Sequence, residues 1–306
     1  MADSSQPGKR FADAAVVGGY RVGALAARLM PGPLAAGAAT SLGFGASFTN
    51  SAKRSMIEHH LQRVNPSLTG IALRAASQKS FDSYAKYYME SFRLPHLSKR
   101  VVDRGFTRDG YHHIEEAVAQ GNGVILALPH LGGWEWAGRW MTDVGHKLTV
   151  VVEPLQPPEL FEWFTELRRS LGMNVVPLGP KAGTAVLSAL RNNEVVCLLC
   201  DRDIERTGVS VDFFGERTTL PAGPATLSLR TGAPILPTAV YFTPRYNGHH
   251  AIIRPPVANH RLAGLRDDVA RVTQSLAVEL EFLIRRSPEQ WHLFQPNWPS
   301  DPGFDD

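Results

Sequence analysis

The feature that most constrains the fold is a repeated alternation, from about residue 111 onward, between short apolar runs and stretches with helical periodicity. The apolar runs are typical of strands that are buried on both faces of a sheet, and they lie at 124–128, 148–152, 175–177, 195–199, 235–241 and 251–254. Helices are expected at 114–120, 134–142, 158–171, 182–190, 222–231 and 267–286. This alternation predicts an α/β fold with a central, mostly parallel sheet flanked by helices on both faces.

The first 110 residues differ from the rest in charge and in pattern. Helices are expected at 11–30, 53–64 and 71–92, the first being either an amphipathic helix that lies on lipid or a plain packing helix. This region holds fifteen Lys and Arg against seven Asp and Glu, whereas the remainder holds seventeen against twenty-two. Positive charge beside apolar stretches favours an anionic membrane surface over nucleic acid as the partner, because no recognition or base-stacking motif accompanies it.

Residues 29–52 carry no charged side chain and are long enough to cross a bilayer. Their prolines, glycines and hydroxyl side chains make them only weakly apolar, so we expect an interfacial or packed segment and a peripheral membrane contact. We treat 1–306 as a single domain, with a helical membrane-associating region at 1–110 and an α/β catalytic core at 111–306. The two cysteines, Cys197 and Cys200, lie in an expected buried strand and are interpreted as core residues.

One passage carries chemistry that a catalytic site could use, namely Ala127-Leu128-Pro129-His130-Leu131-Gly132-Gly133-Trp134-Glu135. His130 directly follows a strand and Glu135 falls in the first turn of the next helix, at the strand end where open α/β sheets place their sites. A neutral histidine can accept a proton from an alcohol near pH 7, most effectively when a carboxylate holds its other ring nitrogen. We therefore expect His130 to be the general base and Glu135 to orient it.

This passage resembles the H-x(4)-D/E motif of the lipid A lauroyl/myristoyl acyltransferase superfamily. Further blocks resemble the same superfamily at 200–203, 211–215, 220–225, 232–237 and 288–294, so the resemblance covers about residues 50–300. It implies an acyltransferase on the cytoplasmic face of the plasma membrane that uses acyl-CoA or acyl carrier protein as donor. Within the superfamily the chain looks most like the actinobacterial enzymes that transfer palmitoyl from its CoA thioester to a mannose of a phosphatidylinositol mannoside. Another membrane glycolipid or an amino-lipid is the alternative acceptor, and a peripheral lipid-binding protein is the non-enzymatic alternative.

The resemblance also suggests roles for further side chains. Arg168, with Arg169 as the competing choice, is expected to stabilise the oxyanion that forms on the thioester carbonyl. Asp201 follows a strand end and is assigned to acceptor binding or to support of His130. The other expected acceptor-binding residues are Arg202, Asp203 and Glu153, although Arg202 and Asp203 could instead form a structural ion pair.

Acyl and CoA binding are assigned to Trp134, Phe213, Phe214 and Gly215, with the alternative that the aromatic residues are plain core. Gly223 belongs to an expected turn into a helix, where the N-terminus can hold a phosphate. His292 is interpreted as structural. The sequence requires no metal and no permanently bound cofactor, with acyl-CoA acting as a co-substrate.

Overall fold

The computed structural model describes the backbone of residues 7–304 and the side chains of residues 13–304 other than Ala15. Its helices are α1 (Pro7–Leu29), α2 (Gly32–Thr49), α3 (Ser51–Val64), α4 (Gly70–Arg93), α5 (Lys99–Arg104), α6 (His112–Ala119), α7 (Trp134–Asp143), α8 (Pro158–Ser170), α9 (Ala182–Arg191), α10 (Gly223–Thr231) and α11 (Leu265–Arg285). Its strands are β1 (Phe106–Asp109), β2 (Val124–Leu128), β3 (Leu148–Val152), β4 (Asn174–Pro177), β5 (Val195–Leu199), β6 (Val209–Phe213), β7 (Glu216–Leu220), β8 (Ile235–Phe242) and β9 (His249–Ile253). Short 3-10 turns lie at Leu94–His96 and Pro288–Gln290.

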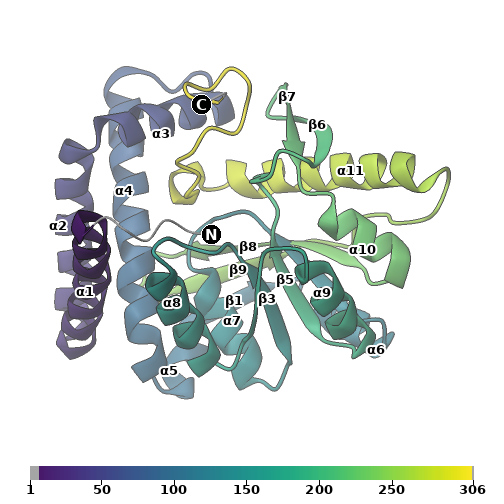
Figure 1. The fold of residues 1–306 in the computed structure, drawn as a ribbon, viewed down its shortest axis with the longest axis horizontal. Coiled ribbons are helices and arrows are strands. Elements are labelled where there is room, and N and C mark those ends of the chain that lie inside the picture. The colour runs from purple at the N-terminus through teal and green to yellow at the C-terminus, as the bar shows by residue number, and fades with distance from the viewer. Residues whose placement is uncertain (1–6, 305–306) are drawn as a thin grey trace.

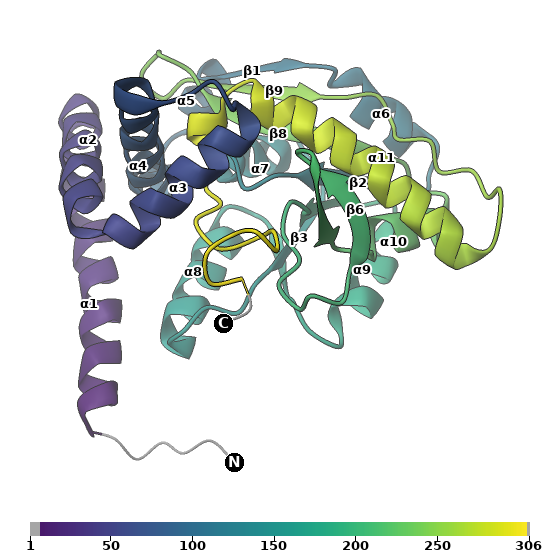
Figure 2. The same cartoon turned by 90° about the horizontal axis from the view of Figure 1, so that it is seen from above.

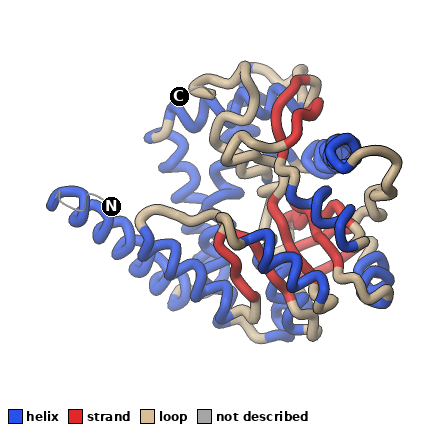
Figure 3. Tube along the Cα trace, turned by 45° about the vertical axis from the view of Figure 1, so that its right-hand side comes forward, coloured by secondary structure: helices blue, strands red, loops and turns tan. Residues whose placement is uncertain are grey.

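A sheet forms the centre of the molecule (Figures 1 and 3). It has seven strands in the order β1-β9-β8-β2-β5-β3-β4. Neighbouring strands are parallel except for the antiparallel pair β8 and β9. β2 lies between β5 and β8, so both of its edges and both of its faces are covered. The expected mostly parallel α/β sheet is confirmed.

The two faces of the sheet form two separate apolar cores. Val124, Leu126 and Leu128 of β2 pack with residues of α6, α7 and α8 on one face. Ile125 and Ala127 point the other way and pack with residues of α9, α10 and α11. This alternation along one strand explains why β2 is a continuous apolar run, since neither of its faces meets water.

The N-terminal helices form a layer at one side of the sheet, with α1 and α2 both against α4 (Figure 2). In α2, the small residues Ala35, Ala39 and Gly43 are buried, whereas Leu42 and Phe48 are 63% and 69% exposed. The uncharged segment at 29–52 is thus largely a helix that is packed on one side and exposed and apolar on the other. None of the helices between residues 7 and 304 is both long and apolar enough to cross a membrane.

Two elements differ from the sequence-based expectation. β1 pairs in parallel with β9, so the sheet takes in residues that we assign from sequence to the helical region. β6 and β7 form a hairpin outside the main sheet, with Phe214 and Gly215 at its turn in positive-φ conformations of 50° and 79°. Neither β1 nor the hairpin of β6 and β7 stands out in the sequence, because these strands are short and carry charged side chains at exposed positions.

Candidate active site

The candidate site lies at the carboxyl edge of the sheet, where three neighbouring strands end. His130 follows β2, Asp201 follows β5 and Glu153 follows β3, and these strands are adjacent in the order β2-β5-β3. Loops at this edge of a parallel sheet converge, which brings side chains from distant parts of the sequence together. The prediction that His130 lies at a strand end is confirmed.

The loop after His130 is shaped by two glycines. Gly132 has a φ of 59°, and a Cβ at this position would lie 1.9 Å from the carbonyl oxygen of Val240. A Cβ at Gly133 would lie 2.7 Å from the ring Nε2 of His249. A side chain at Gly132 would require a backbone shift, and one at Gly133 would have to displace the buried His249 ring, so the glycines fix the path from β2 into α7.

His130 is held by Asp201 and not by Glu135. The His130 Nδ1 lies 2.7 Å from Asp201 Oδ1, and the His130 backbone N–H donates to Asp201 Oδ2 at 3.0 Å. Trp291 Nε1 also donates to Asp201 Oδ2, at 2.7 Å, and the Asp201 side chain is fully buried. Burial alone would raise the pKa of Asp201, but His130 and the hydrogen bonds from His130 and Trp291 outweigh it and hold the pKa below its ordinary value.

This contact fixes the tautomer of the imidazole. An ionised Asp201 accepts a hydrogen bond from Nδ1–H, which leaves Nε2 of the neutral ring as a proton acceptor. The His130 side chain is 32% exposed, and His130 lines two cavities. The arrangement can therefore accept a proton from a bound hydroxyl and stabilise the imidazolium that results.

Glu135 belongs to a second buried network. The expected contact between Glu135 and His130 is wrong, because Glu135 Oε1 accepts hydrogen bonds from Tyr87 Oη at 2.6 Å and from Arg168 Nη2 at 3.0 Å. Burial raises the pKa of Glu135, and the Arg168 charge and the two hydrogen bonds oppose that rise. The first turn of α7 therefore directs Glu135 toward α4 and α8, away from the end of β5.

Arg168 is not a solvated helix charge. Its side chain is 11% exposed, and its guanidinium lies 5.1 Å from the ring centre of Trp134 and 5.7 Å from that of Phe164. Its Nε is buried and has no hydrogen-bond partner among the described residues. Arg169, the competing choice, points away and is 59% exposed beside Glu166.

Two cavities meet at His130. The first has a volume of about 200 Å³ and is lined by aromatic and polar side chains, including Tyr84, Tyr87, Tyr88, Trp134, Arg168 and His292. The second has a volume of about 350 Å³ and is lined mainly by apolar side chains of β3, β5, α9 and α10. Glu153 and Arg202 form an ion pair and line both cavities, so Arg202 pairs with Glu153 and the alternative of a structural pair with Asp203 is not found. We call these hollows the aromatic cavity and the apolar cavity.

The remaining predicted residues divide between the apolar cavity and the core. Asp203 and Gly223 line the apolar cavity, with Asp203 accepting a hydrogen bond from the Gly208 backbone at 2.7 Å. Phe213 and Phe214 are buried, and the Phe213 ring stacks on Trp298 with the ring centres 5.5 Å apart. Together with Gly215, they belong to the hairpin of β6 and β7 and line neither cavity, which agrees with the alternative that these aromatic residues are plain core.

The structure adds residues that the sequence analysis misses or reads as structural. Trp291 bonds Asp201, and His292 lines the aromatic cavity, where its Nε2 lies 2.9 Å from Ser83 Oγ. Burial, with a further contribution from His130, lowers the pKa of His292 to about 3. The C-terminal block contains both residues, so the resemblance at 288–294 is a signal for them, but sequence alone does not reveal which side chain meets Asp201.

The C-terminal segment, residues 291–304, is fixed to α3 through Asp301. Asp301 accepts from the Asn297 and Trp298 backbone N–H groups at 2.7 and 3.0 Å, and it lies 3.1 Å from His60 Nε2. Burial would raise the pKa of Asp301, but these hydrogen bonds hold it well below its ordinary value. This anchor positions the segment that carries Trp291 and His292 into the site.

Other chemistries find less support in the described residues. Between residues 13 and 304, no group of three or more His, Cys, Asp or Glu side chains is arranged to hold a metal ion. Cys197 and Cys200 are buried and unbridged, and burial raises the pKa of the Cys197 thiol to about 12. A thiol with so high a pKa is a poor nucleophile, which agrees with the interpretation of both cysteines as core residues.

Comparison with known proteins supports the resemblance. Residues 14–300 match the family of bacterial lipid A biosynthesis acyltransferases. A Mycobacterium tuberculosis protein named phosphatidylinositol mannoside acyltransferase is 43% identical over 72% of this chain and 70% of its own length. A Mycolicibacterium smegmatis protein of the same name is 35% identical over 92% of this chain and 91% of its own. The lipid A biosynthesis acyltransferase of Haemophilus influenzae is 26% identical over 78% and 73%, respectively.

Proposed function

Because this chain belongs to the family of bacterial lipid A biosynthesis acyltransferases, we propose that it transfers a palmitoyl group from acyl-CoA to a mannose hydroxyl of a phosphatidylinositol mannoside. The names of the two mycobacterial relatives support this acceptor, and acyl transfer to a glycolipid is common to the relatives and the family. The observation that carries the proposal is the His130–Asp201 pair, which leaves an imidazole nitrogen free where two cavities of different polarity meet.

The two cavities suit the two substrates. Apolar walls favour an acyl chain, so the apolar cavity is the proposed donor site, with Gly223 at the start of α10 near the phosphates of CoA. Tyrosine and tryptophan rings with polar edges favour a sugar, so the aromatic cavity is the proposed acceptor site. Glu153 and Arg202 line both cavities and are the proposed contacts for the acceptor hydroxyls.

In the proposed reaction, the mannose oxygen attacks the thioester carbonyl carbon while His130 Nε2 accepts the hydroxyl proton. The resulting imidazolium is stabilised by the buried carboxylate of Asp201. The tetrahedral intermediate carries its negative charge on the former carbonyl oxygen, and Arg168 supplies the positive charge and an unpartnered Nε donor near it. Cleavage of the carbon–sulfur bond then releases CoA, whose sulfur takes the proton from His130.

We place the protein peripherally on the cytoplasmic face of the plasma membrane as part of this proposal, and the exposed apolar side chains of the N-terminal layer support the membrane contact. Leu25 and Leu29 of α1 are 56% and 76% exposed, and Phe44 and Phe48 of α2 are 56% and 69% exposed. Large apolar side chains gathered on neighbouring helices favour insertion into the outer part of a lipid layer. Such a position would present a lipid-linked acceptor to the site without extraction into water.

The test is incubation of the full chain with palmitoyl-CoA and a panel of acceptors, with mass spectrometry of the lipids and a thiol assay for CoA. We expect palmitoylated phosphatidylinositol mannoside from the parent protein and from His96→Ala, which removes an exposed histidine, but not from His130→Ala. Acylation of a different glycolipid or of an amino-lipid would show that this lipid, and not phosphatidylinositol mannoside, is the acceptor. CoA release without an acylated lipid would make the protein a thioesterase, and lipid binding without turnover would make it a peripheral lipid-binding protein.

A further inference from the structure

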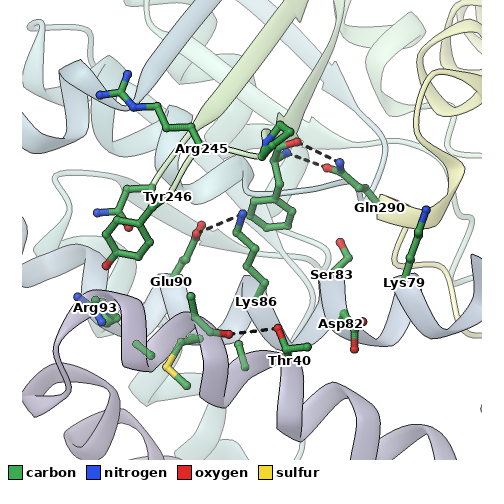
Figure 4. Close-up of a pocket in the computed structure, with 18 of the residues that line it drawn as sticks. Thr40, Lys79, Asp82, Ser83, Lys86, Glu90, Arg93, Arg245, Tyr246 and Gln290 are labelled. Carbon is green, nitrogen blue, oxygen red and sulfur yellow. Dashed lines mark hydrogen bonds and ion pairs between the residues drawn. The ribbon is translucent and has the colours of Figure 1, made fainter.

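A third hollow lies between α2, α4 and the loop that joins β8 to β9 (Figure 4). We call it the lateral groove. Its volume is about 450 Å³, and it shares no lining residue with the aromatic or the apolar cavity. α4 separates it from the site, because Lys86 and Glu90 face the groove whereas Tyr84, Tyr87 and Tyr88 face the aromatic cavity.

The groove is open because one of its walls consists of small residues. Ala35, Ala36 and Ala39 of α2 line it, and their spacing places them on one face of the helix. Tyr246 closes one end against α2, so closely that a Cβ on Gly32 would lie 1.8 Å from the tyrosine oxygen. Met89 of α4 and Phe242 at the end of β8 add further apolar surface. The floor of the groove is therefore apolar and smooth.

The rim of the groove carries basic side chains from two directions. Lys79, Lys86 and Arg93 follow one another at intervals of seven residues along α4, which places them on one face about 10 Å apart. Arg245, on the loop between β8 and β9, also lines the groove, with its guanidinium turned outward to the carbonyl oxygen of Arg104 at 3.0 Å (Figure 4). Among the described residues, no carboxylate lies within ion-pair distance of Lys79, Arg93 or Arg245, and the Lys86 amine is 3.7 Å from Glu90 Oε1.

Three carboxylates, Asp82, Glu90 and Glu289, also line the groove. Asp82 accepts a hydrogen bond from Gln78 at 2.9 Å, and Glu90 Oε2 lies 2.8 Å from His249 Nε2. Glu289 accepts a hydrogen bond at 3.1 Å from the hydroxyl of a neighbouring serine. Hydrogen bonds from neutral groups leave the charges of Asp82 and Glu289 in place, so the four basic and three acidic side chains give the groove a formal charge of +1 beside its apolar floor.

We propose that the lateral groove binds one anionic phospholipid from the membrane surface. The lipid phosphate would lie among Lys86, Arg93 and Arg245, and the first part of an acyl chain would lie over the alanines of α2. A soluble anion would use the rim but not the apolar floor, and a zwitterionic lipid would use the floor with less gain from the rim. The opposite face of α2 exposes Phe44 and Phe48, so the groove lies across this helix from the surface that we propose to meet the membrane. The inference does not require acyl transfer.

The experiment measures binding of a short-chain lipid that is soluble as a monomer. The full chain is titrated with dioctanoylphosphatidylglycerol, dioctanoylphosphatidylcholine and inorganic phosphate by calorimetry, and the stoichiometry is read by native mass spectrometry. We expect one phosphatidylglycerol per chain, bound at least tenfold more tightly than phosphatidylcholine, and no binding of phosphate alone. Equal affinity for the two lipids, or binding of phosphate alone, would overturn the proposal.

Two pairs of variants locate the bound lipid. Lys86→Gln with Arg245→Gln should weaken binding at least tenfold, whereas Arg266→Gln, which removes an exposed charge of α11, should not. The second pair compares Ala36→Trp, which fills the groove, with the control Ser41→Trp, which places the same side chain elsewhere on the exposed part of α2. Thermal melts establish that each variant is folded.

Three results would reject the groove as a lipid site. Unchanged affinity in both groove variants would do so. Displacement of the lipid by a thioether analogue of palmitoyl-CoA would assign it to the active-site cavities and would leave the proposed function intact. Dimerisation of the chain in place of lipid binding would make the groove an interface between two copies.

Discussion

Replacement of Asp201 by asparagine tests the chemistry of the His130 pair without changing the shape of the side chain. Asp201 Oδ2 accepts two hydrogen bonds, from the His130 backbone N–H and from Trp291 Nε1. In Asp201→Asn only the amide oxygen can accept them, so the amide NH₂ must take the position of Oδ1, 2.7 Å from His130 Nδ1. Nδ1 must then accept, which places the ring proton on Nε2 and removes the proton acceptor from the cavities.

The size of the effect follows from the lost charge. When His130 becomes an imidazolium, its charge lies about 4 Å from the carboxylate charge, and at an effective dielectric constant of about 20 their attraction is about 4 kcal/mol. Since each 1.36 kcal/mol changes a rate about tenfold, the rate of transfer should fall about a thousandfold. The change of tautomer adds to this loss.

The assay follows CoA release and lipid acylation with palmitoyl-CoA and the mannoside acceptor. Asp267→Asn is the matched control, because Asp267 is exposed in the first turn of α11 and lines neither the aromatic nor the apolar cavity. We expect near-parental turnover from the control and a large loss in kcat from Asp201→Asn, with similar melting temperatures. Turnover of Asp201→Asn within tenfold of the parent would refute the role of the pair.

Three further predictions test the rest of the site. Gly183→Leu places a side chain in the apolar cavity and should lower kcat/KM for palmitoyl-CoA about tenfold relative to octanoyl-CoA. Thr184→Leu, which lies outside the cavity, should leave this ratio unchanged. An unchanged ratio in Gly183→Leu would show that the acyl chain does not bind in this cavity. Arg168→Met leaves the buried Glu135 charge unpaired and should lower the free energy of unfolding in urea by about 3–5 kcal/mol. The double variant Arg168→Met with Glu135→Gln should recover much of that loss. If it does not, the broken ion pair is not the cause of the lost stability. Burial holds the pKa of His292 at about 3, against 6.5 in the unfolded chain, so only the unfolded chain binds this proton between those values. The free energy of unfolding should therefore fall as pH drops from 6.5 toward 3, by up to about 1.4 kcal/mol per pH unit from this group, and His292→Gln should flatten the slope between pH 6.5 and 4.5.

The sheet could be predicted from sequence because its central strands are buried on both faces. The apolar runs at 124–128, 148–152 and 195–199 match β2, β3 and β5 residue for residue. β1 escaped prediction because three of its four residues are exposed and polar, so it lacks the apolar run that marks the other strands. α2 is rich in alanine and glycine, so its hydropathy is weak. Its sequence does not show which face is packed, and that face becomes evident only when α4 lies against it.

The site was predictable only as far as local sequence determines it. His130 is fixed by the end of β2 and by two glycines whose role is local, so its position follows from the motif. The partner of His130 depends on the pairing of β2 with β5, which brings residues 71 positions apart to 2.7 Å. Sequence spacing favours Glu135, but the helix that begins at Trp134 turns that side chain to the other network. Strand order, which spacing does not encode, decides between the two carboxylates.

The two buried networks also connect the site to opposite parts of the chain. The His130–Asp201 pair depends on Trp291, in a C-terminal segment that Asp301 ties to α3. The Glu135–Arg168 pair depends on Tyr87, from the same α4 that contacts α1 and α2 on its other side. The aromatic cavity is therefore completed by residues from both ends of the sequence and not by the sheet alone. It follows that the N-terminal helices cannot be displaced without an effect on the site. A displacement of α4 that moves Tyr87 would remove a hydrogen bond from Glu135, whose charged form is already made costly by burial.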